Sequence, residues 1–165
     1  MNKEIINEFK ESNSIPDIFE VVKKSVWEVL KKSRAGLELG LAEIGNTPKG
    51  FLGAFYIGGS NMIVMNETPL RRIQETNPDL LNPYICTVLM HEYLHSLGFF
   101  DENEARRLTH QICMEVFGKD NIITQLAADI TKFIPQLIYP EGAPQIPYKV
   151  RLIKDFDRSS IRYIG

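Results

Sequence analysis

The stretch YICTVLMHEYLHSLG (residues 84–98) predicts an apolar helix that carries two histidines and one glutamate. Its aliphatic residues recur at helical spacing, and neither glycine nor proline interrupts the run before Gly98. Gly98 is typical of a helix end, because glycine readily adopts the left-handed backbone conformation found there. We expect one continuous helix that begins at about residue 80 or 83 and ends at residue 97.

The segment His91-Glu92-Tyr93-Leu94-His95 is an HExxH motif on this predicted helix. Residues four apart lie on one helix face, about 6 Å apart along the axis, so His91 and His95 can bind the same zinc ion. Zinc lowers the pKa of a bound water to about 7, and Glu92 flanks the same face. The motif therefore predicts Zn²⁺ as cofactor, His91 and His95 as ligands, and Glu92 as the general base of a hydrolase.

A catalytic zinc ion needs a third protein ligand and one open position. If residues 101–117 form a helix, Asp101 and Glu102 both lie within about 60° of the centre of its apolar face. Asp101 is the favoured third ligand, with Glu102 as the alternative and Glu104 and Glu115 as less favoured candidates. Asp101 has a competing use, since aspartate is a common helix N-cap.

The sequence on either side of this region predicts the other elements. Upstream we expect fraying of residues 1–14, a helix that opens at residues 14–17 and ends near residues 32–36, strands at 37–41, 51–57 and 62–66, and a short helix at 68–75. Downstream we expect helices at 101–117 and 120–134. This order predicts an α+β fold with a small mixed sheet.

The C-terminal segment differs in character from the rest of the chain. Four prolines and a glycine between residues 135 and 147 prevent long regular elements, although residues 150–153 can add one strand. The segment is also too apolar for a solvated linker. We therefore divide the chain into a domain of residues 1–134 and an arm of residues 135–165, which packs on the domain, covers its cleft or binds a partner.

Composition and charge narrow the functional classes. The chain has 165 residues, 44% of them apolar and 24% charged, which suits one globular domain. A net charge of −2 gives no electrostatic signature for nucleic acid or for an anionic membrane. No apolar run is long enough to cross a bilayer, and the N-terminus is not a signal peptide, so we expect a cytoplasmic protein. Cys86 and Cys113 lie in apolar stretches and are predicted to be buried free thiols.

The motif and its surroundings resemble the zincin metallopeptidases over about residues 51–117. In zincins, an edge strand of the sheet aligns the extended substrate and the active-site helix follows. The resemblance implies a zincin-like fold, a peptide or protein substrate, and residues 62–66 as the edge strand that pairs with the substrate backbone.

Two zincin branches suggest different third ligands. The pattern from His91 to Asp101, HExxHxxGxxD, looks like the metzincin pattern, in which the snapalysin branch places Asp at the last position. The segment Glu102-Asn103-Glu104-Ala105-Arg106 looks like the E-x-E-A-D segment of gluzincins, whose first Glu binds zinc. Minigluzincins are similarly compact, and their terminal segments block the site.

Two other functions remain open. One is a binding or latent protein of zincin fold whose cleft is blocked by the C-terminal arm. The other is a metal-dependent endoribonuclease, because the bacterial rRNA-maturation family uses His-x3-His-x5-His and Asp101 takes the third position here. That family has glycine after the first histidine, where this chain has Glu92. The sequence predicts no oligomeric state.

Overall fold

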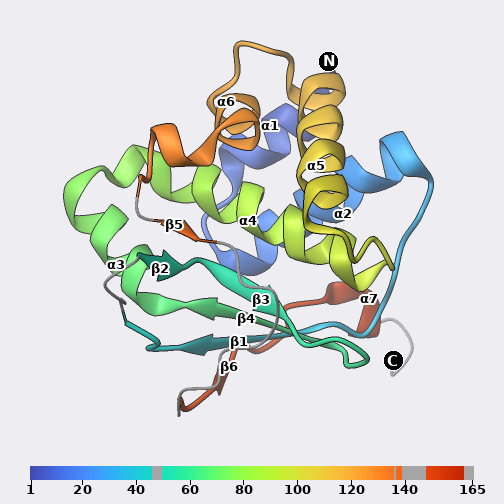
Figure 1. Ribbon diagram of the computed structural model, residues 1–165. Coiled ribbons are helices and arrows are strands. Elements are labelled where there is room, and N and C mark those ends of the chain that lie inside the picture. Colours follow the sequence, from blue (N-terminus) through green and yellow to red (C-terminus); the bar gives the residue numbers. More distant parts are fainter. Residues whose placement is uncertain (46–49, 136, 139–147, 162–165) are drawn as a thin grey trace.

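The computed structural model describes residues 1–45, 50–135, 137–138 and 148–161. A sheet with the strand order β3-β4-β1-β6 lies beneath a layer of helices (Figure 1). Its strands are β3 (Ala54–Tyr56), β4 (Met62–Asn66), β1 (Glu38–Ala42) and β6 (Arg151–Leu152). β1 runs parallel to β4 and antiparallel to β6, and β3 runs antiparallel to β4. The predicted α+β fold with a small mixed sheet is therefore confirmed.

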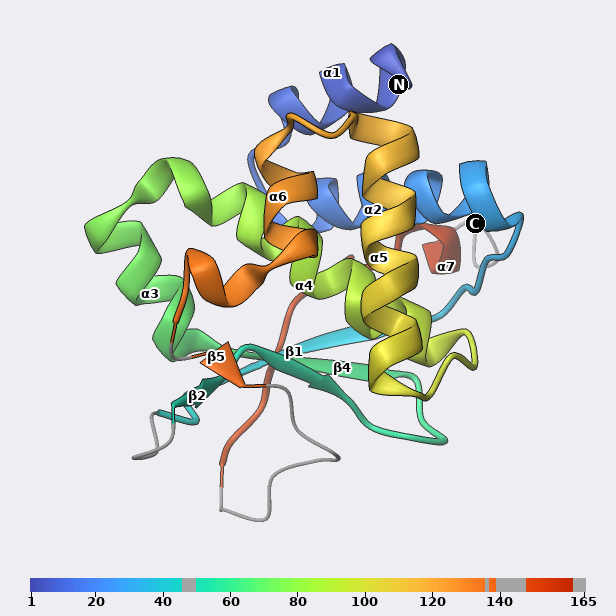
Figure 2. The same ribbon diagram turned by 45° about the horizontal axis from the view of Figure 1, so that its top comes forward.

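Helix α4 occupies the centre of the helical layer, where α2, α5 and α6 pack around it above the sheet (Figure 2). The helices are α1 (Lys3–Glu11), α2 (Ile15–Leu30), α3 (Glu67–Thr76), α4 (Leu81–Ser96), α5 (Glu102–Phe117), α6 (Ile122–Ala128) and α7 (Arg158–Ile161). Short 3-10 turns follow α3 at Pro78–Leu80 and α6 at Ile130–Lys132. The predicted central helix is confirmed, whereas α6 ends earlier than expected because Asp129 leaves the helical conformation.

The prediction that Met62–Asn66 is the edge strand is wrong. This segment is β4, which is paired with β1 on one side and with β3 on the other. A turn through residues 57–61, with Gly59 at φ +76°, folds the chain so that β3 lies outside β4. The edge next to the helical layer is therefore β3. A separate parallel pair joins β2 (Phe51–Leu52) to β5 (Leu137–Ile138).

The N-terminal residues are ordered by capping and packing, so the expectation that residues 1–14 fray is wrong. The Asn2 side chain accepts the Ile5 N–H at 3.1 Å and begins α1. The Asn2 N–H donates to the Val116 carbonyl at 2.8 Å, which ties this end to α5. Ile5 is buried, and the Phe9 ring meets the Phe117 ring edge-on.

Residues 148–161 of the predicted arm share the core of the domain. β6 completes the sheet, and the buried Phe156 ring stacks on Phe19 with centroids 4.0 Å apart. Asp157 is buried and accepts a hydrogen bond from Lys23 Nζ at 2.8 Å. The described residues 148–161 therefore belong to the same core as residues 1–134 and do not form a second one. Residues 136, 139–147 and 162–165 of the arm lie outside the described residues.

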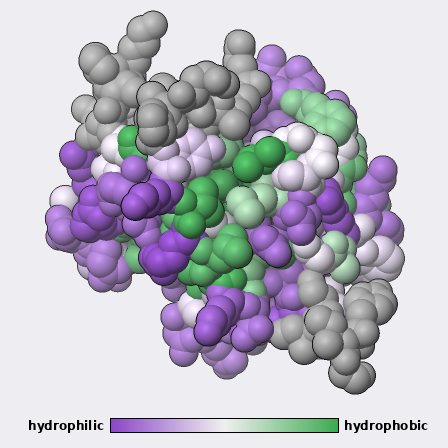
Figure 3. All heavy atoms as spheres, turned by 90° about the horizontal axis from the view of Figure 1, so that it is seen from below, coloured by the Kyte–Doolittle hydropathy of each residue, from purple (hydrophilic) through white to green (hydrophobic). Residues whose placement is uncertain are grey.

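The face of the sheet that points away from α4 carries a small second apolar cluster. Figure 3 shows hydrophobic side chains gathered on this face. The cluster consists of Ala42, Phe55 and Val64, with Ile44, Ile57, Met62 and Tyr148 packed against them. Among the described residues, no helix combines the length and apolarity needed to cross a bilayer. Cys86 and Cys113 are buried free thiols, as predicted.

Candidate metal centre

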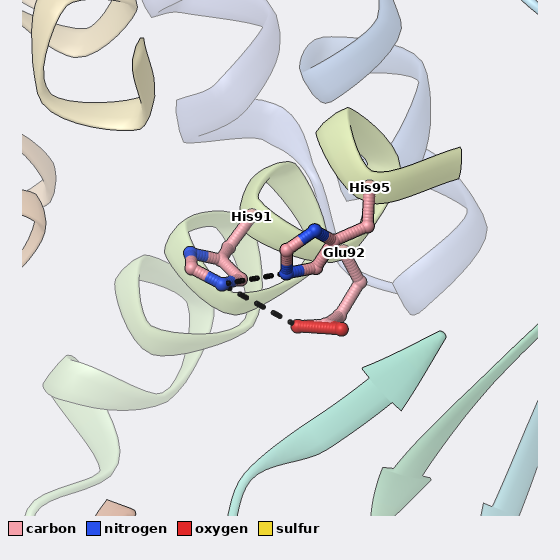
Figure 4. A group of neighbouring side chains, drawn as sticks. All are labelled: His91, Glu92 and His95. Carbon is pink, nitrogen blue, oxygen red and sulfur yellow. Dashed lines mark hydrogen bonds and ion pairs between the residues drawn. The ribbon is translucent and has the colours of Figure 1, made fainter. Parts of the chain in front are cut away.

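The HExxH residues lie on the most buried helix of the molecule. Every α4 residue from Pro83 to Ser96 is buried, because the helix contacts α2, α5, α6 and β3. His91 is 1% exposed, Glu92 3% and His95 7%. The three side chains point to the same side of α4, above strand β3 (Figure 4). The HExxH residues are therefore held in place by the packing of α4 against its neighbouring elements.

The end of α4 orients one of the two imidazoles. Gly98, at φ +106°, donates its N–H to the His95 carbonyl, and the Phe99 N–H donates to the Leu94 carbonyl. This pair of bonds is the Schellman motif. It turns the Phe99 carbonyl back toward the helix, where it accepts the Nδ1–H of His95 at 2.7 Å. Because a carbonyl can only accept, the neutral His95 ring carries its lone pair on Nε2.

Glu102 joins the two histidines from the start of α5. Its Oε2 lies 3.0 Å from His91 Nε2, and its Oε1 lies 2.8 Å from His95 Nε2. The two Nε2 atoms are 3.1 Å apart. The Glu102 side chain is 31% exposed, whereas that of His91 is 2% exposed. The cluster therefore opens toward solvent on the Glu102 side.

The structure does not bring Asp101, the favoured third ligand, to this cluster. Asp101 is exposed, and its Oδ2 accepts the Glu104 N–H at 2.9 Å as the N-cap of α5. The geometry therefore reverses the preference of Asp101 over Glu102. The helix end at Gly98 is confirmed, but the carboxylate that lies beside the histidines after this turn is that of Glu102, one residue after Asp101. Glu104 and Glu115 are exposed on α5.

Lone-pair-bearing atoms converge at the centre of this cluster. Nε2 of neutral His95 points its lone pair toward a Glu102 oxygen and toward His91 Nε2, both within 3.1 Å. Such an arrangement is repulsive unless a proton or a metal cation lies between the atoms. Two nitrogens bound to one tetrahedral zinc ion lie about 3.3 Å apart, given Zn–N distances of about 2.0–2.1 Å. The spacing therefore suits a shared divalent cation.

The charges of these groups are coupled. Burial lowers the pKa of His91 below its ordinary value, and the hydrogen bond to Glu102 only partly offsets this effect. For His95, burial also disfavours the protonated ring, but Glu102 and Glu92 outweigh it and raise the pKa. Burial by itself would raise the pKa of Glu102, yet the hydrogen bonds that both histidines donate when their Nε2 atoms are protonated lower it to about 2. Glu102 is therefore the ionised member of the cluster.

Glu92 is close to the histidines but has a different environment. Ligand atoms of His91, Glu92 and His95 all lie within 4.8 Å of one another. The Glu92 Oε2 is nevertheless 4.0 Å from His91 Nε2, farther than either contact of Glu102, so Glu102 is the carboxylate nearer to the imidazole nitrogens. Burial raises the pKa of Glu92 to about 8, although the backbone N–H of Tyr56 in β3 favours the ionised form.

Comparison with known proteins gave no match, since no family model, curated protein or solved structure is significantly similar to this chain. The case for this site therefore depends on its own geometry.

Two contributors to the cluster were missed by the sequence analysis. The Phe99 carbonyl fixes the His95 tautomer, and the helix stop at Gly98 was the signal that could have indicated it. Arg34, which contacts the residues after Glu92 and His95, lies in an irregular segment where no periodicity indicates its direction.

Proposed function

We propose that this chain is a zinc-dependent hydrolase of zincin-like fold and that it acts as a metallopeptidase. His91, His95 and Glu102 would hold the ion, and Glu92 would act as the general base. The observation that carries the proposal is the convergence of two imidazole nitrogens and the Glu102 carboxylate, with contacts of 2.8 to 3.1 Å.

The donor set supports zinc among the common cations. Two imidazoles and one carboxylate form a typical three-ligand set for catalytic zinc, which leaves the fourth position for water or substrate. The Nδ1–H of His95 is already held by the Phe99 carbonyl, the kind of outer contact that metal-bound histidines usually make. When bound, the ion would supply Lewis acidity that makes water a nucleophile near neutral pH.

Glu92 has the properties of a proton carrier. It lies beside both histidines without contacting either as closely as Glu102 does. A carboxyl group whose pKa is near 8 holds and releases a proton around neutral pH, which suits an acid–base role better than a permanently ionised group. We therefore assign proton transfer to Glu92 and charge neutralisation of the cation to Glu102.

The position of β3 supports a peptide substrate. Among the described residues, β3 pairs with β4 on one side and is the edge strand next to α4. An extended peptide can add to such an edge through backbone hydrogen bonds, which would bring a peptide bond close to Glu92. The edge-strand role that the zincin resemblance gave to Met62–Asn66 thus passes to Ala54–Tyr56 in this proposal.

The alternative functions receive less support from the geometry. The endoribonuclease pattern needs Asp101 as its third position, and the Asp101 carboxylate caps α5 instead. A purely structural zinc site usually has four closed protein ligands, often cysteines, whereas Cys86 and Cys113 are buried and have raised pKa values. A purely structural zinc site also does not explain the buried Glu92 beside the cation-binding groups.

The test combines metal analysis with peptide cleavage by the full chain. We expect about one zinc ion per chain in both the wild type and Glu92→Gln. Cleavage of a fluorogenic peptide library should fall about 10²- to 10⁴-fold in Glu92→Gln, the usual contribution of a general base. Glu104→Gln, an exposed substitution on α5, serves as the matched control and should retain activity. Cleavage that survives Glu92→Gln, or that persists after chelation, would contradict the proposal.

A further inference from the structure

Arg34 lies between α2 and β1, and its hydrogen bonds reach the helix that carries the candidate centre. Its backbone N–H donates to the Tyr93 hydroxyl at 3.0 Å, and its Nη1 donates to the Ser96 carbonyl at 3.0 Å. Tyr93 directly follows Glu92 in the chain, and Ser96 directly follows His95. Arg34 therefore forms hydrogen bonds to the last turn of α4, the helix that carries Glu92 and His95.

The same guanidinium fastens the end of edge strand β3. Its Nη1 also donates to the Tyr56 hydroxyl at 3.0 Å, and its Nη2 donates to the Ser60 carbonyl at 2.8 Å. The Tyr56 hydroxyl donates to the same Ser60 oxygen at 2.6 Å, which closes a ring of polar contacts. The backbone N–H of Tyr56 is also the group that faces the Glu92 carboxylate. One side chain thus connects the strand and the helix that enclose Glu92.

We propose that Arg34 is a positioning residue that sets the separation between β3 and the last turn of α4, and thereby the location of the Glu92 carboxylate. This inference rests on the proposed hydrolase function. Within the described residues, the hydrogen bonds of Arg34 go to Tyr56, Ser60, Tyr93 and Ser96, and not to His91, Glu92 or His95. Removing Arg34 should therefore alter the geometry of catalysis and leave the proposed metal ligands in place.

The role requires arginine and not merely a positive charge. A guanidinium presents several N–H donors in fixed directions, and here they serve three different oxygen acceptors. A lysine ammonium is a compact charge that cannot hold all three acceptors in the same geometry. Displacement of a catalytic group by about 1 Å costs about 10²-fold in rate, so loosening this connection should affect kcat strongly.

The experiment compares Arg34→Met and Arg34→Lys with Arg71→Met in the full chain. Arg71 is a matched control because its guanidinium also makes two hydrogen bonds, at 2.8 and 2.9 Å, but to Glu43 at an exposed position. The first measurement is amide hydrogen exchange in the metal-free protein. We expect exchange about 10-fold faster at Tyr56 and at residues 93–96 in Arg34→Met, with no change there in Arg71→Met.

The second measurement is zinc affinity and peptide cleavage by the same variants. In Arg34→Met we expect kcat to fall about 10²-fold with unchanged zinc affinity, and Arg34→Lys should recover part of the loss. A lower melting temperature with unchanged kcat in the folded protein would show a merely structural role and overturn the inference. If the wild type cleaves no peptide, the proposed function fails, and the exchange result decides the inference alone. Unchanged exchange at Tyr56 in Arg34→Met would then overturn it.

Discussion

Glu92 on α4 and Glu102 at the start of α5 flank the same two imidazoles, yet their pKa values are displaced in opposite directions. Burial raises the pKa of Glu92 to about 8. For Glu102, hydrogen bonds from His91 and His95 outweigh the opposing effect of burial and lower the pKa to about 2. Carboxyl groups whose pKa values are pushed apart within one site typically divide the acid–base and electrostatic roles.

The helices that carry the two glutamates explain this difference. Helix α4 is buried from Pro83 to Ser96, so packing fixes Glu92 away from water. Helix α5 is amphipathic and buries one face, and Glu102 lies in its first turn beside the solvent-exposed cap Asp101. In the proposed mechanism, a buried helix therefore supplies the group that exchanges protons, and the first turn of a half-exposed helix supplies the charge that holds the cation.

The largest expected effect is on zinc affinity and comes from removing the negative charge of Glu102. We expect Glu102→Gln to weaken zinc binding by about 100-fold or more, because even residues behind the direct ligands contribute about 10- to 100-fold to metal affinity. Glu92→Gln should leave the affinity almost unchanged, since the Glu92 Oε2 lies 4.0 Å from His91 Nε2. Competition with a zinc-specific fluorescent chelator measures both variants. Equal losses in the two variants would show that both carboxylates bind the ion, and the division of roles would be wrong.

A smaller effect should appear in the stability of the metal-free protein. The pKa of Glu92 is about 8 in the folded chain and 4.5 as a model value, so the folded state retains a proton that the unfolded state loses between these pH values. Below pH 4.5, Glu92 therefore does not reduce the free energy of unfolding. That free energy decreases as the pH rises from 4.5 toward 8. Glu92→Gln removes this titration and should stabilise the protein above pH 8 by a few kcal/mol, on the order set by the pKa shift.

Glu102→Gln should change stability with the opposite sign. The lowered pKa of Glu102 means that its contribution is present above the model value of 4.5 and is lost as the pH falls toward 2. Urea unfolding of both variants from pH 4 to 9, with a chelator present, compares the two residues directly. If Glu92→Gln were destabilising across this whole range, the buried carboxyl would have to be ionised in the folded chain.

Much of the α4 region could be predicted from the sequence, whereas the start of α5 could not. An uninterrupted apolar run before Gly98 dictates a buried helix, and the HExxH spacing then places His91, Glu92 and His95 together whatever surrounds them. The identity of the proposed third ligand depends on where α5 begins, because Asp101 and Glu102 lie at similar angles to its buried face. A shift of one residue decides which carboxylate caps the helix and which faces the histidines.

The order of the strands in the sheet likewise could not be predicted from local sequence patterns. Met62–Asn66 and Ala54–Tyr56 both have strand character, and only long-range pairing determines that β4 is interior and β3 is at the edge. Helix α1 is a different case, since Asn2 as cap and the apolar residues Ile5, Ile6 and Phe9 were readable signals. The polarity of residues 1–14 predicted fraying, but packing against α5 and α2 keeps α1 helical.

The smallest expected effect sharpens the contrast between the neighbours Asp101 and Glu102. Asp101→Ala removes the side-chain acceptor of the Glu104 N–H and should destabilise the metal-free protein by about 1 kcal/mol, the usual cost of losing an N-cap. Its zinc affinity should stay close to that of the wild type, since the Asp101 carboxylate is bonded to its own helix. Asp101→Asn, which retains a capping oxygen, is the control and should restore most of the stability. If Asp101→Ala instead lost zinc as severely as Glu102→Gln, the ligand would be the residue that the HExxHxxGxxD spacing favours, and α5 would have to begin differently once metal is bound.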